Sequence, residues 1–149
     1  KRPDIAVHAA NQAGLRLIVA GSGPESKRLQ AIAGPNVEFI ESPTREALRD
    51  LYRRTRALVF PGIEDFGMTL VEAQACGAPV IARGEGGAVE SVQDGVTGIL
   101  YGHPSPGALA EALAAFEPSQ MSLDDIVSNA ARFRRDRFIE QMRDIVVRV

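Results

Sequence analysis

The stretch Glu64-Asp-Phe-Gly-Met-Thr-Leu-Val-Glu72 places two carboxylates around a loop that contains a glycine. Two short apolar runs flank it, residues 57–60 and 79–82, and we interpret both as buried strands. The glycine lets the backbone approach a ligand closely, and a helix beginning within the stretch offers free N–H groups to anions or hydroxyl groups. The stretch therefore predicts a strand, a ligand-binding loop and a short helix.

The rest of the chain alternates between short apolar runs and helical patterns. Strands separated by helices indicate βαβ units, because parallel strands need a crossover connection. The sequence therefore predicts an α/β fold class, with a Rossmann-like parallel sheet and helices on both faces. Further strands are expected at residues 15–20, 36–40 and 98–101, and helices at about 5–10, 25–33, 44–56, 88–93, 106–116 and 136–149, with others from 69 and from 122.

Three loops that contain glycine follow predicted strands, at residues 21–25, 61–69 and 83–87. In open parallel sheets, ligands bind outside the carboxyl ends of the strands. We therefore expect these loops to share one rim of the sheet, formed by the carboxyl ends of its strands.

The composition is that of an ordinary globular protein and excludes several classes. The 149 residues carry a net charge of −2, so no basic field favours nucleic acid. Cys76 is the single cysteine, which rules out a disulfide framework within the chain and fits a reducing compartment. No apolar run reaches the length of a transmembrane helix. We predict a cytoplasmic protein, with peripheral binding at the inner face of the membrane left open by Arg132, Arg134, Arg135 and Arg137.

The longer segment from Phe60 to Ala82 joins these features into one motif, with Phe-Gly between the glutamates and Gly-Ala-Pro-Val after them. Together with Gly86-Gly87 and Gly21-Ser-Gly-Pro24, it resembles the signature of GT-B glycosyltransferases of family 4. Within that family it resembles the mannosyltransferase-like branch of polysaccharide assembly, over nearly the whole chain. The resemblance implies that residues 1–149 form a single nucleotide-sugar-binding domain, the C-terminal half of such an enzyme. The N-terminal acceptor-binding domain would be absent, and the isolated half is expected to be inactive.

The resemblance also implies roles for particular residues. Glu72 would bind the ribose hydroxyls, because a carboxylate accepts charge-assisted hydrogen bonds from both. Glu64 and Lys1 would form the catalytic set, with Glu64 at the donor sugar and Lys1 at the pyrophosphate. The base is expected near Ile40. Further donor contacts are expected from six residues: Phe66, Gly67, Met68, Thr69, Gly21 and Gly23.

The implied reaction is the retaining transfer of a hexose to a glycan or lipid-linked acceptor. Mannose from GDP-mannose is the first expectation, followed by UDP-glucose-type donors. Negative charge builds on the leaving diphosphate, where a lysine and helix N–H groups stabilise it without a metal. We therefore expect no cofactor besides the nucleotide-sugar, no metal and no protein nucleophile.

Several alternatives remain at this point. Thr69 and Glu72 have the spacing of a capping box, in which Glu72 would bond to the backbone at Thr69 instead of a ligand. A sugar-nucleotide epimerase would keep the fold and change the chemistry, and a degenerate half would be a non-catalytic nucleotide-sugar-binding module. A dinucleotide-dependent dehydrogenase is disfavoured because the glycines at 21 and 23 lack the third glycine of that motif.

Overall fold

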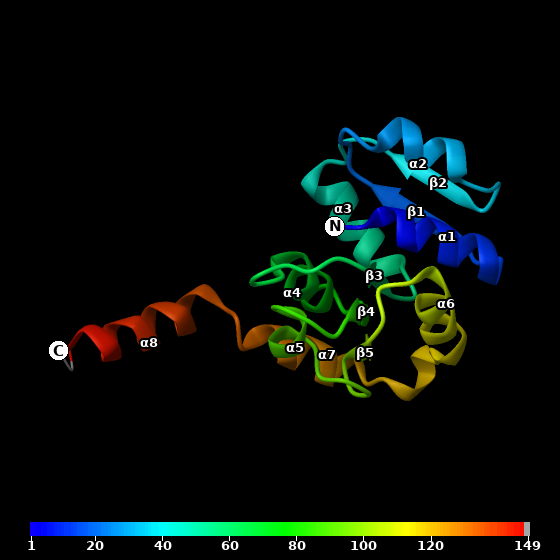
Figure 1. Ribbon diagram of the computed structural model, residues 1–149. Helices are drawn as coiled ribbons and strands as arrows, with labels where there is room; N and C mark the ends of the chain where they lie inside the picture. The colour runs from blue at the N-terminus through cyan, green and yellow to red at the C-terminus, as the bar shows by residue number, and fades with distance from the viewer. Residues whose placement is uncertain (148–149) are drawn as a thin grey trace.

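The computed structural model describes residues 1–147, so the last two residues of the predicted C-terminal helix lie outside the described part. Each strand is followed by a helix along the chain (Figure 1). The strands are β1 (Leu17–Ala20), β2 (Val37–Ile40), β3 (Leu58–Phe60), β4 (Val80–Arg83) and β5 (Gly98–Tyr101). The helices are α1 (Pro3–Ala13), α2 (Ser26–Ile32), α3 (Arg45–Arg54), α4 (Met68–Ala75), α5 (Ala88–Ser91), α6 (Pro106–Ala115), η1 (Pro118–Gln120), α7 (Leu123–Ala131) and α8 (Arg135–Val147).

The strands form two parallel sheets, and this confirms the predicted fold class. Hydrogen bonds join β1 to β2 in one sheet, and β3, β4 and β5 in that order in the other. The sequence predicted one continuous sheet, whereas among the described residues no ladder joins the two-stranded sheet to the three-stranded one. Strand identity is a local property of the sequence, but the choice of a neighbouring strand is not.

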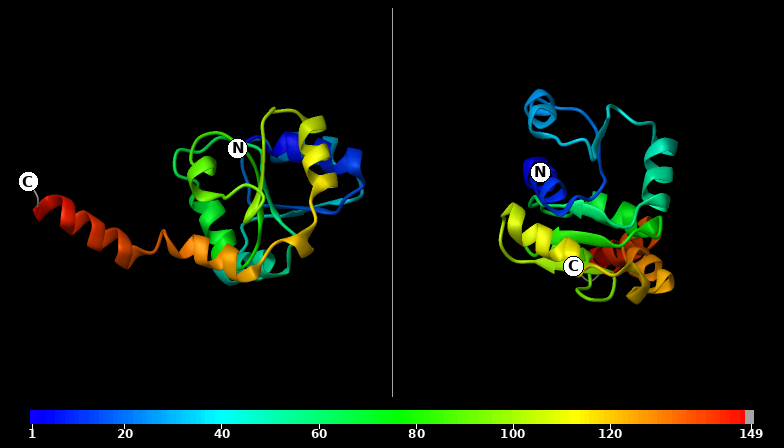
Figure 2. Two further views of the ribbon diagram at one scale, coloured as in Figure 1. Left: turned by 90° about the horizontal axis from the view of Figure 1, so that it is seen from below. Right: turned by 90° about the vertical axis from the view of Figure 1, so that its right-hand side faces the viewer.

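Helices cover both faces of the sheets, as Figure 2 shows. Helices α1 and α6 pack together on one face, and α4 and α7 pack together on the other. Strand β4 shows why, because successive side chains of a strand point to opposite faces. Ile81 packs in a cluster with Ile5 and Leu109, whereas its neighbours Val80 and Ala82 pack in a second cluster with α4.

Local sequence signals place the helix ends. The Thr44 and Ser105 hydroxyls each accept a hydrogen bond from the N–H three residues on, at 3.2 Å, as N-caps do. Pro3 and Pro106 lie in the first turns of α1 and α6, and Gly14 ends α1 in the left-handed conformation. These local signals fix where each helix begins or ends.

Helix α8 projects from the body of the protein (Figure 1). None of its described side chains is buried. No helix among residues 1–147 is both long enough and apolar enough to cross a membrane.

Candidate functional site

The loop after β3 rests on the glycine turn after β4. The Gly87 N–H donates a hydrogen bond to the Glu64 carbonyl oxygen at 2.7 Å. A Cβ atom on Gly87 would lie 2.5 Å from the carbonyl carbon and oxygen of Phe66, and one on Gly86 would lie 2.5 Å from the Glu64 oxygen. Only glycine allows backbones to approach this closely, so the 64–69 loop and the 86–87 turn form one continuous surface.

Gly67 begins helix α4 at the end of this loop. Its φ of 77° is left-handed, and no side chain caps the helix at this position. The Leu70 N–H donates to the Gly67 oxygen at 2.9 Å, which starts the helical hydrogen bonding. The N–H groups of Met68 and Thr69 have no intrahelical partner, because the first residues of a helix never do. These groups are free to face a ligand at the rim.

Glu72 lies on α4 with its side chain exposed. The alternative that Glu72 completes a capping box with Thr69 is wrong, because the helix begins at Met68 and Thr69 already lies inside it. Residues three and four apart share a helix face, so Glu72 lies on the same side of α4 as Met68 and Thr69. Its negative charge also acts on Tyr52: burial, and secondarily the charge of Glu72, raise the pKa of Tyr52 to about 12.

Lys1 lies beside Glu64. The Lys1 Nζ is 2.9 Å from the Glu64 Oε1 and 5.9 Å from the centre of the Phe60 ring. A Cβ on Gly62 would lie 2.7 Å from the backbone of Lys1, so the start of the chain packs directly on this loop. An exposed ion pair stabilises a fold by only about 0–1 kcal/mol. The pair therefore matters more for the placement of the two charges than for stability.

The other predicted residues gather at the end of the two-stranded sheet. The Gly21 N–H donates to the Ile40 carbonyl oxygen at 2.9 Å, and the Gly23 N–H donates to the Ser26 Oγ at 3.1 Å. Over residues 1–147, no hydrogen bond or ion pair joins this group to Glu64 or its loop. The site thus has two parts, one at the carboxyl end of each sheet.

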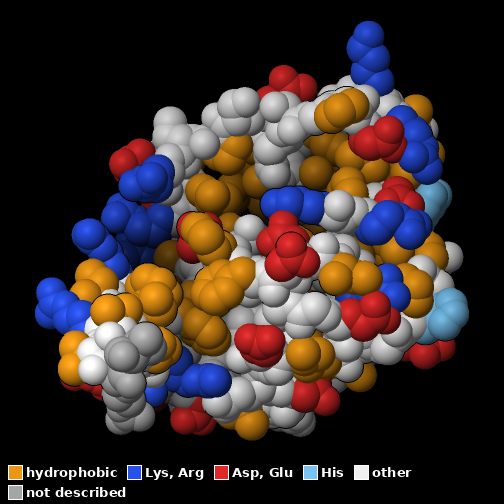
Figure 3. Space-filling view, turned by 60° about the vertical axis from the view of Figure 1, so that its left-hand side comes forward, with side chains coloured by type: hydrophobic (Ala, Val, Ile, Leu, Met, Phe, Trp, Pro, Cys, Tyr) orange, Lys and Arg blue, Asp and Glu red, His pale blue; other side chains and the backbone are white. Residues whose placement is uncertain are grey.

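The face seen in Figure 3 is hollowed in its upper part, with hydrophobic side chains on the floor of the hollow. Lys or Arg side chains and Asp or Glu side chains lie at its rim. Such a surface suits a ligand that combines flat apolar groups with charged ones.

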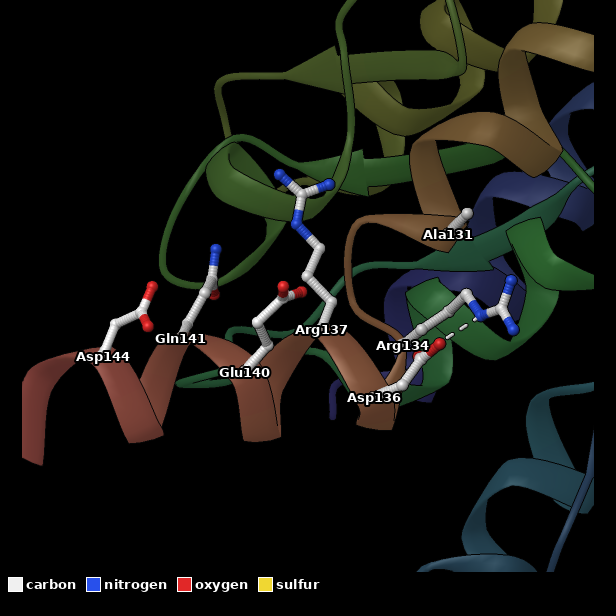
Figure 4. A pocket seen from close by; sticks show the side chains of 7 residues that line it. All are labelled: Ala131, Arg134, Asp136, Arg137, Glu140, Gln141 and Asp144. Atoms are coloured by element: carbon white, nitrogen blue, oxygen red, sulfur yellow. Dashed lines mark ion pairs between the residues drawn. The ribbon is translucent and has the colours of Figure 1, made fainter. Parts of the chain in front are cut away.

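Two grooves lie along the start of α8. One, of about 620 Å³, is lined mainly by charged side chains of α8, which Figure 4 shows pointing away from the helix beside an ion pair between Arg134 and Asp136. The other, of about 530 Å³, reaches the 64–69 loop at Phe66. The Phe66 ring meets the ring of Phe133 edge-on, with centroids 5.8 Å apart.

The sequence did not single out a set of buried polar side chains behind the 64–69 loop. Gln74, Ser91 and Asn129 lie on three different helices and are almost fully buried. In the sequence, Gln74 stands between two alanines of α4, but this pattern alone does not distinguish a buried amide from an exposed one.

Comparison with known proteins adds a family. The sequence pattern of the family described as "Glycosyl transferases group 1" matches residues 1–133. A D-inositol 3-phosphate glycosyltransferase of Mycobacterium tuberculosis (strain ATCC 25618 / H37Rv) is 36% identical over 126 residues, which cover 76% of this chain and 26% of that protein. The chain thus spans about a quarter of the length of the curated relatives it matches.

Solved structures share the fold. A sucrose-phosphate synthase from Thermosynechococcus elongatus is similar with a TM-score of 0.80 and 27% identity, over 97% of this chain and 41% of that one. Anabaena Alr3699/HepE in complex with UDP-glucose is similar with a TM-score of 0.77 and 25% identity, over 100% of this chain and 46% of that one.

Proposed function

The chain belongs to the glycosyl transferases group 1, and we propose that it is the donor-binding domain of a retaining glycosyltransferase. One observation carries the proposal: Glu64 and Glu72 lie on either side of a helix start whose N–H groups are free. Lys1 adds a positive charge next to Glu64. We also propose that it belongs to family 4 and to the mannosyltransferase-like branch of that family.

The donor is held, in this proposal, by both parts of the rim. Glu72 accepts hydrogen bonds from the two ribose hydroxyls, and the exposed position of its carboxylate supports this role. The N–H groups from Phe66 to Thr69 face the sugar and the pyrophosphate, where the helix N-terminus favours negative charge. Gly21, Gly23 and Ile40 contact the nucleoside at the end of the other sheet.

When the bond between the anomeric carbon and the diphosphate breaks, the sugar passes to the acceptor and negative charge stays on the diphosphate. Lys1 and the N-terminus of α4 stabilise that charge, so the proposal requires no metal. Glu64 orients the sugar and offsets the positive charge that develops at its anomeric carbon. The acceptor attacks from the side of the leaving group, with a phosphate oxygen as the base.

The choice of donor and acceptor rests on relatives. The UDP-glucose in the Anabaena structure makes a UDP-linked hexose the first donor to test, ahead of the GDP-mannose that the sequence favoured. The name of the mycobacterial relative adds an inositol phosphate to the acceptor classes, beside a glycan or a lipid-linked acceptor. We propose that the acceptor site lies in a second domain, so residues 1–149 alone transfer no sugar.

The test is donor turnover by the full-length protein. UDP-glucose and GDP-mannose are supplied with each acceptor class, and release of the nucleoside diphosphate is measured. Glu64→Gln keeps the side-chain shape and removes the charge, and we expect kcat to fall roughly 100-fold, as for loss of an oriented electrostatic group. The matched control is Glu111→Gln, an exposed glutamate on α6, which should leave kcat unchanged. Equal kcat values for the two variants would contradict the role of Glu64.

A further inference from the structure

A network of buried amides joins three helices behind the 64–69 loop. Asn129 on α7 is 3% exposed, and its Nδ2 donates to the Gln74 Oε1 at 2.7 Å and to the Ser91 carbonyl oxygen at 2.8 Å. The Gln74 Nε2 on α4 also donates to that Ser91 oxygen, at 2.9 Å, and to the Leu70 oxygen at 3.2 Å. One asparagine side chain thus connects α4 with the end of α5.

The acceptor atom of Asn129 is also used. Its Oδ1 accepts from the Gln93 Nε2 at 3.1 Å and from the Arg132 Nη1 at 2.8 Å. An apolar contact tolerates sliding, but a buried hydrogen-bond network that is fully satisfied holds its members in one arrangement. Asn129 therefore fixes the relative orientation of the helices around it.

Those helices begin at the site. Helix α4 begins after Gly67, and α5 begins after Gly87, whereas the network contacts both near their C-terminal ends. Helix α4 has eight residues, or roughly 12 Å at 1.5 Å per residue, so a tilt at the network moves Gly67 as well. The end of α5 also lies close to this helix start, because a Cβ added to Gly67 would lie 3.6 Å from the buried Ser91 Oγ.

We propose that Asn129 is a positioning residue for the donor site, an inference that rests on the proposed function. By holding α4 and α5 together, it keeps the Gly86–Gly87 turn packed against the 64–69 loop and the start of α4 directed at the donor. Phe133, just past the C-terminal end of α7, reinforces this through its edge-on contact with Phe66. Misplacement of a binding group by about 1 Å costs up to about 100-fold in rate, so partial loosening should be measurable.

The test is made on the full-length protein with UDP and GDP as probes, and the nucleotide that binds wild type more tightly is used throughout. Asn129→Leu alone leaves the buried Gln74 Oε1 without a donor and risks unfolding. The double variant Gln74→Leu/Asn129→Leu removes both amides together, so no buried amide is left unpaired, although the Ser91 carbonyl oxygen loses both of its side-chain donors. We expect the double variant to fold with a lower Tm, because of that unpaired oxygen, while its Kd for the nucleotide rises roughly tenfold.

Asn36→Leu is the matched control. Its half-buried amide donates to the Ala10 oxygen at 3.1 Å and the Leu15 oxygen at 2.7 Å, at the amino ends of the strands. It should lower Tm and leave the nucleotide Kd within about twofold, because it has no link to α4 or α5. If the double variant does not fold, Gln93→Ala removes one exposed donor to Asn129 and should raise Kd about two- to threefold.

A double variant, or in its place Gln93→Ala, that binds the nucleotide like wild type overturns the inference and leaves the proposed function intact. A wild-type protein that binds neither UDP nor GDP overturns the proposed function, and the inference with it.

Discussion

The two sheets of this protein differ in how tightly their residues are packed. In the three-stranded sheet, Val80, Ile81 and Ala82 of β4 are 0% exposed, and a Cβ on Gly98 of β5 would lie 2.0 Å from the Val80 oxygen. In the two-stranded sheet, the residues of β1 and β2 are half-buried or exposed. A Cβ on Gly23, after β1, would meet no atom within 4 Å.

The difference shows how each part of the site is held. Glu64 and the start of α4 are positioned by backbone packed against backbone, at Gly86 and Gly87. Gly21 and Ile40 are positioned by the end of the β1–β2 ladder, which the Gly21 N–H extends by its hydrogen bond to the Ile40 oxygen. Substitutions in the three-stranded sheet should therefore change stability and the site together. Substitutions in the two-stranded sheet should be able to change one without the other.

The largest expected effect comes from Gly98→Ala. The added methyl group would overlap the Val80 carbonyl in the centre of the sheet, where backbone atoms cannot move aside cheaply. Overpacking a core costs about 1–3 kcal/mol, and a backbone clash belongs at the upper end or beyond. Urea unfolding measures the loss. A free energy of unfolding within about 0.5 kcal/mol of wild type would contradict the close packing of β5 against β4 at Gly98.

A second prediction concerns the helix that links the two sheets. Tyr52 on α3 packs against Ala73 of α4, and burial, followed by the charge of Glu72, raises its pKa to about 12, whereas the unfolded value is near 10. The folded state therefore binds the proton more tightly, and this stability is present below pH 10 and is lost as the pH rises toward 12. Tyr52→Phe keeps the ring but has no hydroxyl to ionise. Over this pH range it should therefore lose up to about 2 kcal/mol less stability than wild type does.

Urea unfolding at pH 9 and pH 12 checks this prediction. Burial also raises the pKa of Tyr101 to about 12, so Tyr101 should account for part of the stability that Tyr52→Phe still loses. The double variant Tyr52→Phe/Tyr101→Phe shows how much stability is lost when neither tyrosine can ionise. The account of Tyr52 fails if Tyr52→Phe loses as much stability between the two pH values as wild type does.

The smallest expected effect comes from the glycine loop of the two-stranded sheet. Gly23→Ala should change the free energy of unfolding by less than about 0.5 kcal/mol, because its Cβ enters open space and its φ is not positive. Gly21→Ala is the matched comparison: its Cβ also enters open space, but its φ of 115° should cost about 1 kcal/mol or more. Equal losses for the two variants would contradict this distinction.

Local signals made much of the fold predictable from the sequence. Caps such as Thr44 and Ser105, and the apolar run of β4, depend on neighbours along the chain. The division into two sheets was not predictable, because it depends on pairing between distant segments. The spacing of Thr69 and Glu72 predicted a possible cap, but the left-handed Gly67 starts the helix earlier and leaves Glu72 exposed.

The site was predictable only where its residues form one motif. Glu64 and Glu72 lie eight positions apart, so their loop and helix could be placed from the sequence. Asn129 and Gln74 are 55 positions apart, and nothing local marks either amide as buried. The ion pair of Lys1 with Glu64 likewise joins distant positions, and the resemblance gave both residues roles without predicting their contact.

The central claim, that Glu72 binds the ribose of a nucleotide-sugar, is tested most directly by titrating ribonucleotides against their 2′-deoxy counterparts. Wild type, Glu72→Gln and the control Glu111→Gln are each titrated with UDP, GDP and the two deoxy analogues. We predict that wild type and the control prefer one ribonucleotide over its deoxy form about tenfold, and that Glu72→Gln binds both forms equally weakly. A Glu72→Gln variant that keeps the wild-type preference would contradict the account.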